Sequence, residues 1–430
     1  MLRDDEAPSP KVAPVELLSR PIRIAYLVTH PIQYQAPLLR YLSAQPDIDL
    51  TVYFQSDLSV KAYYDTEFGR PIQWDVPLLD GYAHEFLPAL GSRRSLGRLM
   101  PLSYGIVTRL LRGKYDFLWV HGYSRWFNWM AITVAWFASI RVLVRDDATL
   151  LSTPRSRLKV WLKRQFFFRV LQSVCDGFLA TGTMNRRYFL DNDIDPGRIF
   201  LMPNCVDNDY FAERAVAASA RREELRAELG LTAGRPIILF AGKFLALKRP
   251  GDLLDAFKRL VARADGQPKP YLLFVGDGEL RPALEESGRS LGDDVRFLGF
   301  RNQSELSSFF DLCDTFVLPS EFESWGMIVN EAMSAGRAVI VSDRVGCAPD
   351  LVSDGVNGHV YPCGDVAALA EALANVLRTP EICAAMGRES AEILRTWSFR
   401  EDIDGLRTAL ATVLRLRRSA GSGKATFADR

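Results

Sequence analysis

The feature that most constrains the fold is an alternation of short apolar runs with helix-like segments. The runs predict buried strands of a parallel sheet, because a strand covered by helices on both faces has no polar side. In the first half we expect helices near 35–44, 126–140 and 186–190. The expected strands of that half lie at 23–28, 50–54, 117–120, 142–144, 178–180 and 199–201.

The alternation stops near residues 205–235, where a charged helix is expected at 221–230, and then starts again. Two doubly wound α/β domains in tandem fit this pattern and the length of 430 residues. Ligands of such sheets bind beyond the carboxyl ends of the strands, so we expect the site in a cleft between the domains. The second series comprises strands at 237–240, 271–275, 295–298, 315–318 and 338–341, and helices at 250–262, 279–290 and 326–335.

Composition excludes several classes of protein. The 53 Lys and Arg residues balance the 52 Asp and Glu residues, so bulk charge gives no indication of nucleic-acid binding. None of the six cysteines forms a CxxC pair, which is typical of reduced thiols in a cytosolic protein. The four histidines form no metal motif. The polar start lacks the core of a signal peptide, and the apolar stretch 126–140 is shorter than the roughly 20 residues that span a bilayer.

Two carboxylates, Glu323 and Glu331, stand eight positions apart, the first after an expected strand and the second in the following helix. If the intervening segment were helical throughout, they would lie about 12 Å apart along the axis. That separation suits two ends of one extended ligand better than two partners in one proton transfer. At each end a carboxylate can accept hydrogen bonds from vicinal sugar hydroxyls. The alternative is that Glu331 only occupies the surface of a helix.

Gly242, Lys243 and Lys248 follow the strand at 237–240 and precede a helix that begins near Pro250. Cations beside a helix N-terminus make a site for phosphate. The alternative is a solvated lysine pair.

Two further strand ends carry candidate residues. Gly276 and Gly278 form a strand–turn–helix junction at which backbone could approach a phosphate or a base, although a lone GxG is weak evidence. His121 lies just past the strand at 117–120, where it could orient a sugar or an acceptor. A structural, hydrogen-bonded histidine explains it equally well.

These motifs together resemble those of the retaining GT-B glycosyltransferases of family four, also called glycosyltransferase group 1. The family's E-x7-E motif is matched by Glu323 and Glu331, and its Gly-Arg…Lys element by residues 242–248 with Lys243 in place of Arg. The segment PNCVD at 203–207 resembles a Pro-Asn-Gly-Val-Asp that closes the first domain. The segment at 353–365 resembles a loop near the end of the second sheet.

The resemblance implies a GT-B fold, in which two Rossmann-like domains face a central cleft. It implies an acceptor-binding domain at 21–205, a nucleotide-sugar-binding domain at 206–395 and a helix at 396–417 that returns to the first domain. A flexible leader at 1–20 and a flexible tail at 418–430 flank them.

The resemblance also assigns roles. Lys243 and Lys248 should contact the donor diphosphate, Glu331 the ribose and Glu323 the transferred sugar. A match of THPIQYQAPLLR, residues 29–40, to a subgroup of the family places Gln33 and Tyr34 at the acceptor. The expected catalytic residues are Glu323, Lys248, Lys243 and His121. The expected donor-binding residues are Gly242, Lys243, Lys248, Gly276, Gly278, Glu323, Gly326, Met327 and Glu331.

The implied reaction moves a hexose from a UDP- or GDP-sugar to a glycan or a polyprenyl- or lipid-linked acceptor in polysaccharide or glycolipid synthesis. The anomeric configuration should be retained. Neither metal nor cofactor is expected, because two lysines and a helix dipole can stabilise the leaving diphosphate. The alternatives are a GT-B sugar phosphorylase or nucleotide-sugar epimerase, a non-catalytic subunit that binds the donor, and a membrane-docking scaffold.

Two segments, 91–114 and 155–170, carry basic residues and no acidic ones. Basic side chains among apolar ones are typical of a helix that binds an anionic membrane surface. A solvated helix face or an acceptor phosphate site would look the same. We therefore expect a cytoplasmic protein that binds peripherally at the inner face of the membrane.

Overall fold

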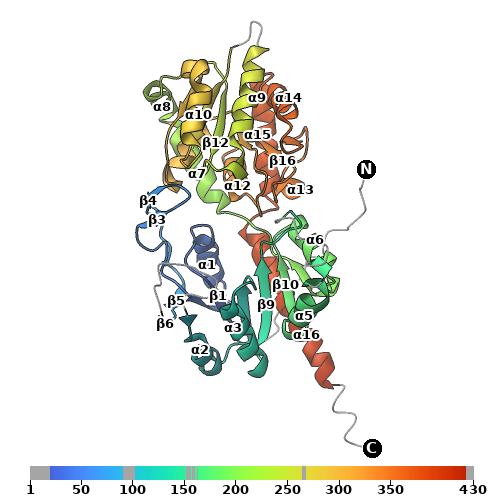
Figure 1. The fold of residues 1–430 in the computed structure, drawn as a ribbon. Coiled ribbons are helices and arrows are strands. Elements are labelled where there is room, and N and C mark those ends of the chain that lie inside the picture. The colour runs from blue at the N-terminus through green and yellow to red at the C-terminus, as the bar shows by residue number, and fades with distance from the viewer. Residues whose placement is uncertain are drawn as a thin grey trace, which may run out of the picture.

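A computed structural model describes residues 20–90, 102–151, 156, 160–161, 163–263 and 268–422. They form two α/β units, each built on one parallel sheet and its flanking helices, with one unit stacked on the other (Figure 1). We call the unit that holds the strands between residues 22 and 201 the first unit, and the one that holds the strands between 237 and 361 the second unit.

The first sheet has seven parallel strands. Six of the strands lie at the predicted positions, and most of their apolar side chains are buried, although Leu201 of β11 is exposed. The edge strand β5 was not predicted, because its sequence AHEF places two polar residues between two apolar ones and so forms neither an apolar run nor an alternating pattern. The order across the sheet is β11 (Ile199–Leu201), β10 (Gly177–Ala180), β9 (Arg141–Asp146), β8 (Phe117–His121), β1 (Ile22–Val28), β2 (Ile48–Phe54) and β5 (Ala83–Phe86).

The second sheet has six parallel strands, five of them at the predicted positions. The prediction of a loop at 353–365 is wrong in part, because Gly358–Tyr361 forms the edge strand β17. A Cβ atom on Gly358 would lie 1.7 Å from the carbonyl oxygen of Val339, so only glycine lets this strand approach its neighbour. The order is β14 (Val295–Phe297), β13 (Tyr271–Val275), β12 (Ile237–Ala241), β15 (Thr315–Leu318), β16 (Ala338–Ser342) and β17 (Gly358–Tyr361).

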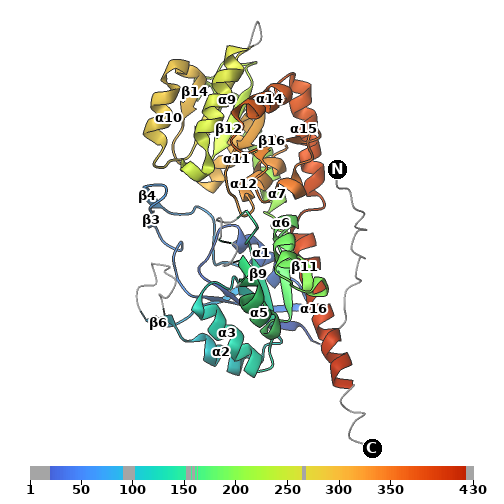
Figure 2. The ribbon, with the colours of Figure 1, turned by 45° about the vertical axis from the view of Figure 1, so that its right-hand side comes forward.

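Helices cover both faces of each sheet (Figure 2). The helix expected at 279–290 is shorter, since α10 ends at Gly288 and a 3₁₀ helix, Arg289–Asp294, continues through the left-handed Gly292. The first unit has α1 (Gln35–Ser43), α2 (Ile106–Gly113), α3 (Trp126–Phe137), a π-helix (Lys163–Phe168), α5 (Arg169–Val174), α6 (Thr183–Asp191) and a 3₁₀ turn (Pro196–Arg198). The remaining helices are α7 (Asn208–Ser219), α8 (Arg222–Glu228), a 3₁₀ turn (Ala246–Lys248), α9 (Pro250–Ala262), α10 (Arg281–Gly288), α11 (Gln303–Leu312), α12 (Met327–Ser334), α13 (Ala348–Leu351), α14 (Val366–Val376), α15 (Pro380–Leu394) and α16 (Phe399–Ser422).

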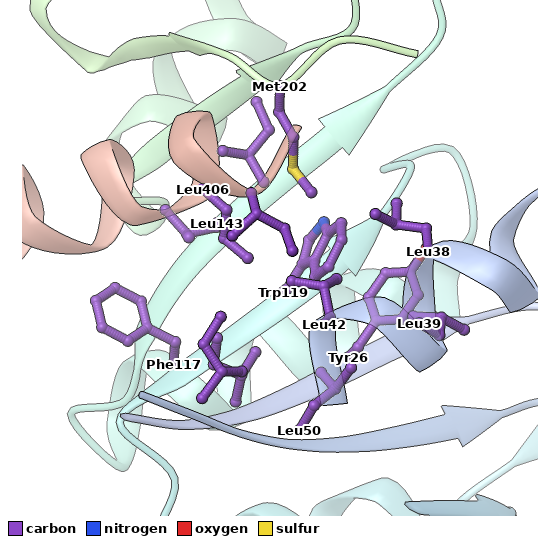
Figure 3. Close-up of a cluster of buried hydrophobic side chains, with 14 of the residues drawn as sticks. Tyr26, Leu38, Leu39, Leu42, Leu50, Phe117, Trp119, Leu143, Met202 and Leu406 are labelled. Carbon is purple, nitrogen blue, oxygen red and sulfur yellow. The ribbon is translucent and has the colours of Figure 1, made fainter. Parts of the chain in front are cut away.

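The last helix, α16, follows the second unit in sequence but packs on the first sheet, against β10, β11 and α1. Figure 3 shows Leu406 of this helix in the same apolar cluster as Leu143 and Met202 of the first unit. Gly405 permits the approach, because a Cβ there would lie 1.8 Å from the carbonyl oxygen of Leu201. The helix runs to Ser422, so the predicted tail at 418–430 is wrong for its first five residues. The rest of that tail and the leader at 1–19 lie outside the described residues.

Two short antiparallel hairpins belong to neither sheet and were not predicted. One pairs β6 (Ala89–Leu90) with β7 (Leu102–Ser103). The other pairs β3 (Tyr63–Asp65) with β4 (Arg70–Ile72). In Figures 1 and 2 this second hairpin extends from the first unit to the side of the second. We call residues 63–75 the arm.

Candidate functional site

A cavity of about 490 Å³ lies between the two units, at the carboxyl ends of both sheets. The first unit contributes residues that follow β1, β8 and β9, together with part of the arm. The second unit contributes residues that follow β12 and β15. Parallel strands collect their C-terminal loops at one edge of a sheet, so segments distant in sequence meet here.

On the side of the first unit, His121 is the last residue of β8. Its Nδ1 lies 3.2 Å from the hydroxyl of Tyr26, and its Nε2 lies 3.7 Å from a carboxylate oxygen of Asp147. The side-chain amide of Asn204 donates to the other oxygen of Asp147, at 2.9 Å. Burial opposes the charge of Asp147, but His121, Arg145 and Asn204 outweigh it and lower its pKa to about 2. A histidine held between a hydroxyl and a carboxylate therefore faces the cavity.

Arg145, which also lines the cavity, is held from behind by α16. Its guanidinium lies 3.2 Å from the carboxylate of Asp402 and donates to the side-chain oxygen of Asn204 at 2.9 Å. Arg145 is 5% exposed and Asp402 is fully buried. Burial raises the pKa of Asp402 to about 6, although Arg145 acts in the opposite direction. A buried ion pair of this kind fixes position more than it adds stability.

On the side of the second unit, Lys248 and Glu323 form an ion pair across the cavity wall. Lys248 ends the 3₁₀ turn Ala246–Lys248, just before α9. The carboxylate of Glu323 also accepts the hydroxyl of Ser320 at 3.2 Å. Helix α12 begins only at Met327, because Gly326 adopts a φ of +98°. Glu323 and Glu331 therefore do not lie on one continuous helix.

Lys243, predicted to bind phosphate, instead contacts the arm of the first unit. Its Nζ lies 3.2 Å from Asp65 and 2.5 Å from Glu67, and 4.8 Å from the ring centre of Phe68. Burial would lower the pKa of Lys243, but the two carboxylates outweigh it and raise that pKa. The lysine thus already holds anionic partners at the edge of the cavity.

A smaller cavity of about 110 Å³ adjoins the first and shares Tyr34, Phe68 and Gly242 with it. Glu331 lines it, is 3% exposed and has its pKa raised to about 8 by burial. Gly276 lines it as well. A Cβ on Gly276, whose φ is +135°, would lie 1.8 Å from the carbonyl oxygen of Gly242.

The comparison of this chain with known proteins identifies its family. Residues 221–392 match the family model described as "Glycosyl transferases group 1". A D-inositol 3-phosphate glycosyltransferase of Saccharomonospora viridis is 30% identical over 316 residues, which cover 68% of this chain and 69% of that protein. The chain belongs to the group 1 glycosyl transferases. It is a glycosyltransferase, as the motifs predicted.

Solved structures show that this glycosyltransferase has the GT-B fold, which confirms the predicted fold class. A glycosyltransferase from Rickettsia africae ESF-5 aligns with a TM-score of 0.70 at 15% identity, over 92% of this chain and 99% of that one. Anabaena HepE in complex with UDP-glucose aligns with a TM-score of 0.61 at 18% identity, over 94% and 100% of the two chains.

Most of the predicted site residues of this glycosyltransferase meet in space. The main cavity is lined by His121, Gly242, Lys243, Lys248, Glu323, Gly326 and Met327, and the adjoining one by Gly276 and Glu331. Gly278 lines neither of these two cavities and packs against the backbone of Phe244, which lies 2.8 Å from the position of an added Cβ. Gln33 and Tyr34 line both.

Sequence reasoning missed the contribution of the arm and of Arg145. Asp65, Phe68 and Trp74 of the arm line the main cavity. The available signal was the density of aromatic and acidic residues in YYDTEFGRPIQWD, which follows no strand or helix pattern. Arg145 carried no signal, because its partner Asp402 lies 257 positions away in the sequence.

The two basic segments of the glycosyltransferase are described only in part. In the described parts, Arg109 pairs with Glu85, Arg164 pairs with Asp193, and Lys163 donates to the hydroxyl of Tyr188 at 2.6 Å. Trp161 and Phe166 are exposed, at 53% and 63%. The basic residues that fall outside the described part are Arg93, Arg94, Arg98, Arg155, Arg157 and Lys159.

Within the described ranges no helix is long and apolar enough to cross a membrane. Among the same residues no group of three or more His, Cys, Asp or Glu side chains is placed to hold a metal ion. The cysteines of the described chain are all free thiols, five of them buried.

Proposed function

We propose that this glycosyltransferase moves a hexose from a UDP- or GDP-sugar to a glycan or lipid-linked acceptor, with retention of the anomeric configuration and without a bound metal ion. The observation that carries the proposal is the facing arrangement of Lys243, Lys248 and Glu323 on the second unit and His121 on the first, across one cavity. The complex of Anabaena HepE with UDP-glucose, a protein of the same fold, supports a nucleotide-sugar donor.

The two lysines would stabilise the leaving diphosphate. Breaking the bond between the anomeric carbon and the diphosphate oxygen places negative charge on that oxygen, and fixed cations in a partly closed cavity stabilise such charge strongly. Lys248 is 23% exposed and Lys243 is 25% exposed, so water screens them less than surface lysines. Lys248 stands just before α9, so the positive end of the helix dipole adds to its charge.

The carboxylates would hold the rest of the donor. Glu323, which is paired with Lys248, would accept hydrogen bonds from the hydroxyls of the transferred sugar. Glu331 lies in the adjoining cavity, where a ribose would bring two hydroxyl donors to it. His121 would orient the sugar or the acceptor from the opposite unit. In the family that this chain resembles, attack from the face of departure retains configuration without a protein nucleophile.

The first experiment is a thermal-shift panel with UDP, GDP, ADP, UDP-glucose, UDP-GlcNAc, GDP-mannose and GDP-fucose, with and without EDTA. A ligand at about 100 times its dissociation constant should stabilise the fold by roughly 2.7 kcal/mol. We expect a shift with one base only, insensitive to EDTA and absent from Lys248→Ala. Product from the best donor is then analysed by NMR for the anomeric configuration.

The other outcomes select among the alternatives. No shift with any of these nucleotides would contradict the proposed donor. Phosphorolysis of a glycan without nucleotide would favour a sugar phosphorylase. Nucleotide binding with no transfer to any acceptor, and full function of Glu323→Ala in cells, would favour a non-catalytic subunit. A shift that EDTA abolishes would contradict metal independence.

We further propose a cytoplasmic protein that contacts the anionic inner face of the membrane through the segment that holds Trp161 and Phe166. Both rings are exposed and lie in contact, and Arg169 nearby is exposed as well. Exposed aromatic rings beside basic residues fit the boundary of an anionic bilayer, where a lipid-linked acceptor would reside.

Sedimentation with phosphatidylglycerol vesicles tests this contact. The Trp161→Ser/Phe166→Ser variant should lose binding. The matched control is Trp136→Ser/Phe137→Ser, which removes an exposed aromatic pair at the end of α3 and should leave binding unchanged. Equal binding by the first variant and the wild type would contradict the proposal, as would binding that is indifferent to the charge of the lipid.

A further inference from the structure

Within the described residues, the arm is the part of the first unit whose side chains contact Lys243 of the second unit. Its strands pair from Tyr63 with Ile72 to Asp65 with Arg70, apart from both sheets. In Figures 1 and 2 the arm lies beside the second unit in both views. What its side chains do there is not explained by the fold of either unit.

The carboxylate of Asp65 is fixed before it meets the lysine. One of its oxygens accepts the backbone N–H groups of Glu67 and Phe68, at 2.9 and 3.0 Å. The side chain is 13% exposed, whereas that of Glu67 is 59% exposed. The turn therefore presents a hydrogen-bonded, partly buried carboxylate and an exposed one to the same ammonium group.

The far end of the arm is also attached to the second unit. Phe68 packs edge-on against Phe300, with ring centres 5.1 Å apart. The side-chain amide of Asn302 donates to the carbonyl of Gln73 at 2.7 Å. Asp75 accepts the N–H of Ser304, at the start of α11. None of these contacts involves Lys243, so they can hold the arm in place when the contact with Lys243 changes.

A nucleotide in the cavity would compete for Lys243. Phe68 and Trp74 line both cavities, so the donor would lie against the arm. A diphosphate near Lys243 brings negative charge close to Asp65 and Glu67, and like charges in a partly buried site repel strongly. The lysine cannot serve both sets of anions without this cost.

On the basis of the proposed function, we infer that Asp65 and Glu67 are positioning residues. They hold Lys243 before the donor binds and release it to the diphosphate when the donor binds. The arm then discriminates among ligands by charge. A nucleoside, which brings no diphosphate, leaves the ion pairs intact. A nucleoside diphosphate must displace them.

The test compares the dissociation constants of UDP, GDP, uridine and guanosine, by calorimetry, for wild type and for Asp65→Asn/Glu67→Gln. These changes keep the shape of the side chains and remove their charge. We expect the nucleoside diphosphate that binds the wild type to bind the variant about 3- to 10-fold more tightly at low salt, from the usual strength of partly exposed ion pairs. The matching nucleoside should bind both proteins equally.

A second pair of proteins isolates the role of the lysine. In a Lys243→Ala background, the competition for the lysine is absent and only direct repulsion between the arm carboxylates and the diphosphate remains. The double change on the arm should therefore alter diphosphate affinity by a different factor than in the wild-type background, and the ratio of the two factors measures the coupling through Lys243. Equal factors in both backgrounds would overturn the exchange. The control variant is Glu85→Gln, which removes a carboxylate paired with Arg109 away from the cavity and should change no affinity. Circular dichroism and thermal unfolding check that each variant is folded.

The outcomes separate the inference from the function on which it depends. Unchanged or weaker diphosphate binding by a folded arm variant would overturn the inference, since the carboxylates would then be structural. Equal tightening of nucleoside and diphosphate would overturn it as well. A wild type that binds none of the four ligands would overturn the proposed donor and the inference with it.

Discussion

The two walls of the cavity are built on different principles. The wall from the second unit comes from two short stretches of chain, at residues 240–248 and 318–328, and a left-handed glycine, Gly326, sets the course of the second stretch. The wall from the first unit takes His121, Arg145 and Asn204 from three separate segments, and one of these residues is held by a helix near the C-terminus. Residues in the wall from the second unit can be replaced one at a time, whereas the wall from the first unit depends on the assembly of that whole unit.

The largest effect is expected on the free energy of unfolding, from a substitution behind the wall of the first unit. Asp402→Ala leaves Arg145 buried without its counter-charge, which should lower the free energy of unfolding by about 3–5 kcal/mol. Urea denaturation measures it. Asp404→Ala is the matched control. This carboxylate lies on the same helix but is 63% exposed, and its distance of 3.6 Å from Arg407 indicates a weak ion pair, so its loss should change the free energy of unfolding little. Equal destabilisation by both changes would contradict the view that the buried pair of Arg145 and Asp402 holds the wall of the first unit.

The second-largest effect is expected on the turnover number and not on the stability of the fold. Lys248→Ala should reduce turnover about 100- to 1000-fold, because a charge-stabilising donor is lost from the transition state. The unfolding midpoint should move little, since Lys248 is partly exposed and belongs to a local turn. Lys258→Ala, on the surface of α9, serves as the control. A variant that unfolds more readily but turns over normally would reverse the assignment of the two walls.

A pH titration of donor affinity tests the role of Glu331 in the second unit. The pKa of Glu331 is raised to about 8, so the empty enzyme holds a proton there at neutral pH. If ribose hydroxyls require the carboxylate, donor binding expels that proton. Affinity for a nucleotide sugar should then rise by up to roughly tenfold per pH unit from pH 6 to 8 and level off above. Glu331→Gln should bind with no such slope. Affinity that falls over this range would contradict the role of Glu331.

The smallest effect probes the network of the first wall. Tyr26→Phe removes the hydroxyl that lies 3.2 Å from His121 and keeps the buried ring. The loss of one such hydrogen bond amounts to about 0.5–1.5 kcal/mol. We expect a severalfold drop in kcat/KM for the acceptor and an unchanged KM for the donor, measured with varied acceptor and then varied donor. An equal effect on donor KM would place His121 nearer the nucleotide.

The sequence predicted elements that have a local signal better than elements that depend on contacts between distant segments. Strands such as Tyr271–Val275 and the helix Pro250–Ala262 were predicted at their observed bounds, because apolar runs and a proline at the first turn are local signals. The residues around Glu323 were predicted from the E-x7-E motif, which lies within one short stretch of sequence. Short polar elements, such as β5 and the arm, carry no periodicity and were missed.

Ion pairs between distant segments had no signal at all. Lys243 was predicted to meet a ligand, and the sequence could not indicate that Asp65, 178 positions earlier, would meet it first. The pairing depends on where a hairpin outside both sheets comes to rest against the other unit. Such placements are a property of the assembled molecule, and local patterns do not encode them.

The position of α16 has a consequence for how the chain is made. Ribosomes deliver the first unit first, yet the helix that covers Leu143 and Met202 of its sheet emerges after the entire second unit. During synthesis the first unit therefore keeps an apolar face open until translation is nearly complete, while the second can close on its own residues. A premature stop codon before residue 399 would accordingly leave a nascent product whose oldest portion, and not its newest, is the part that chaperones must shield.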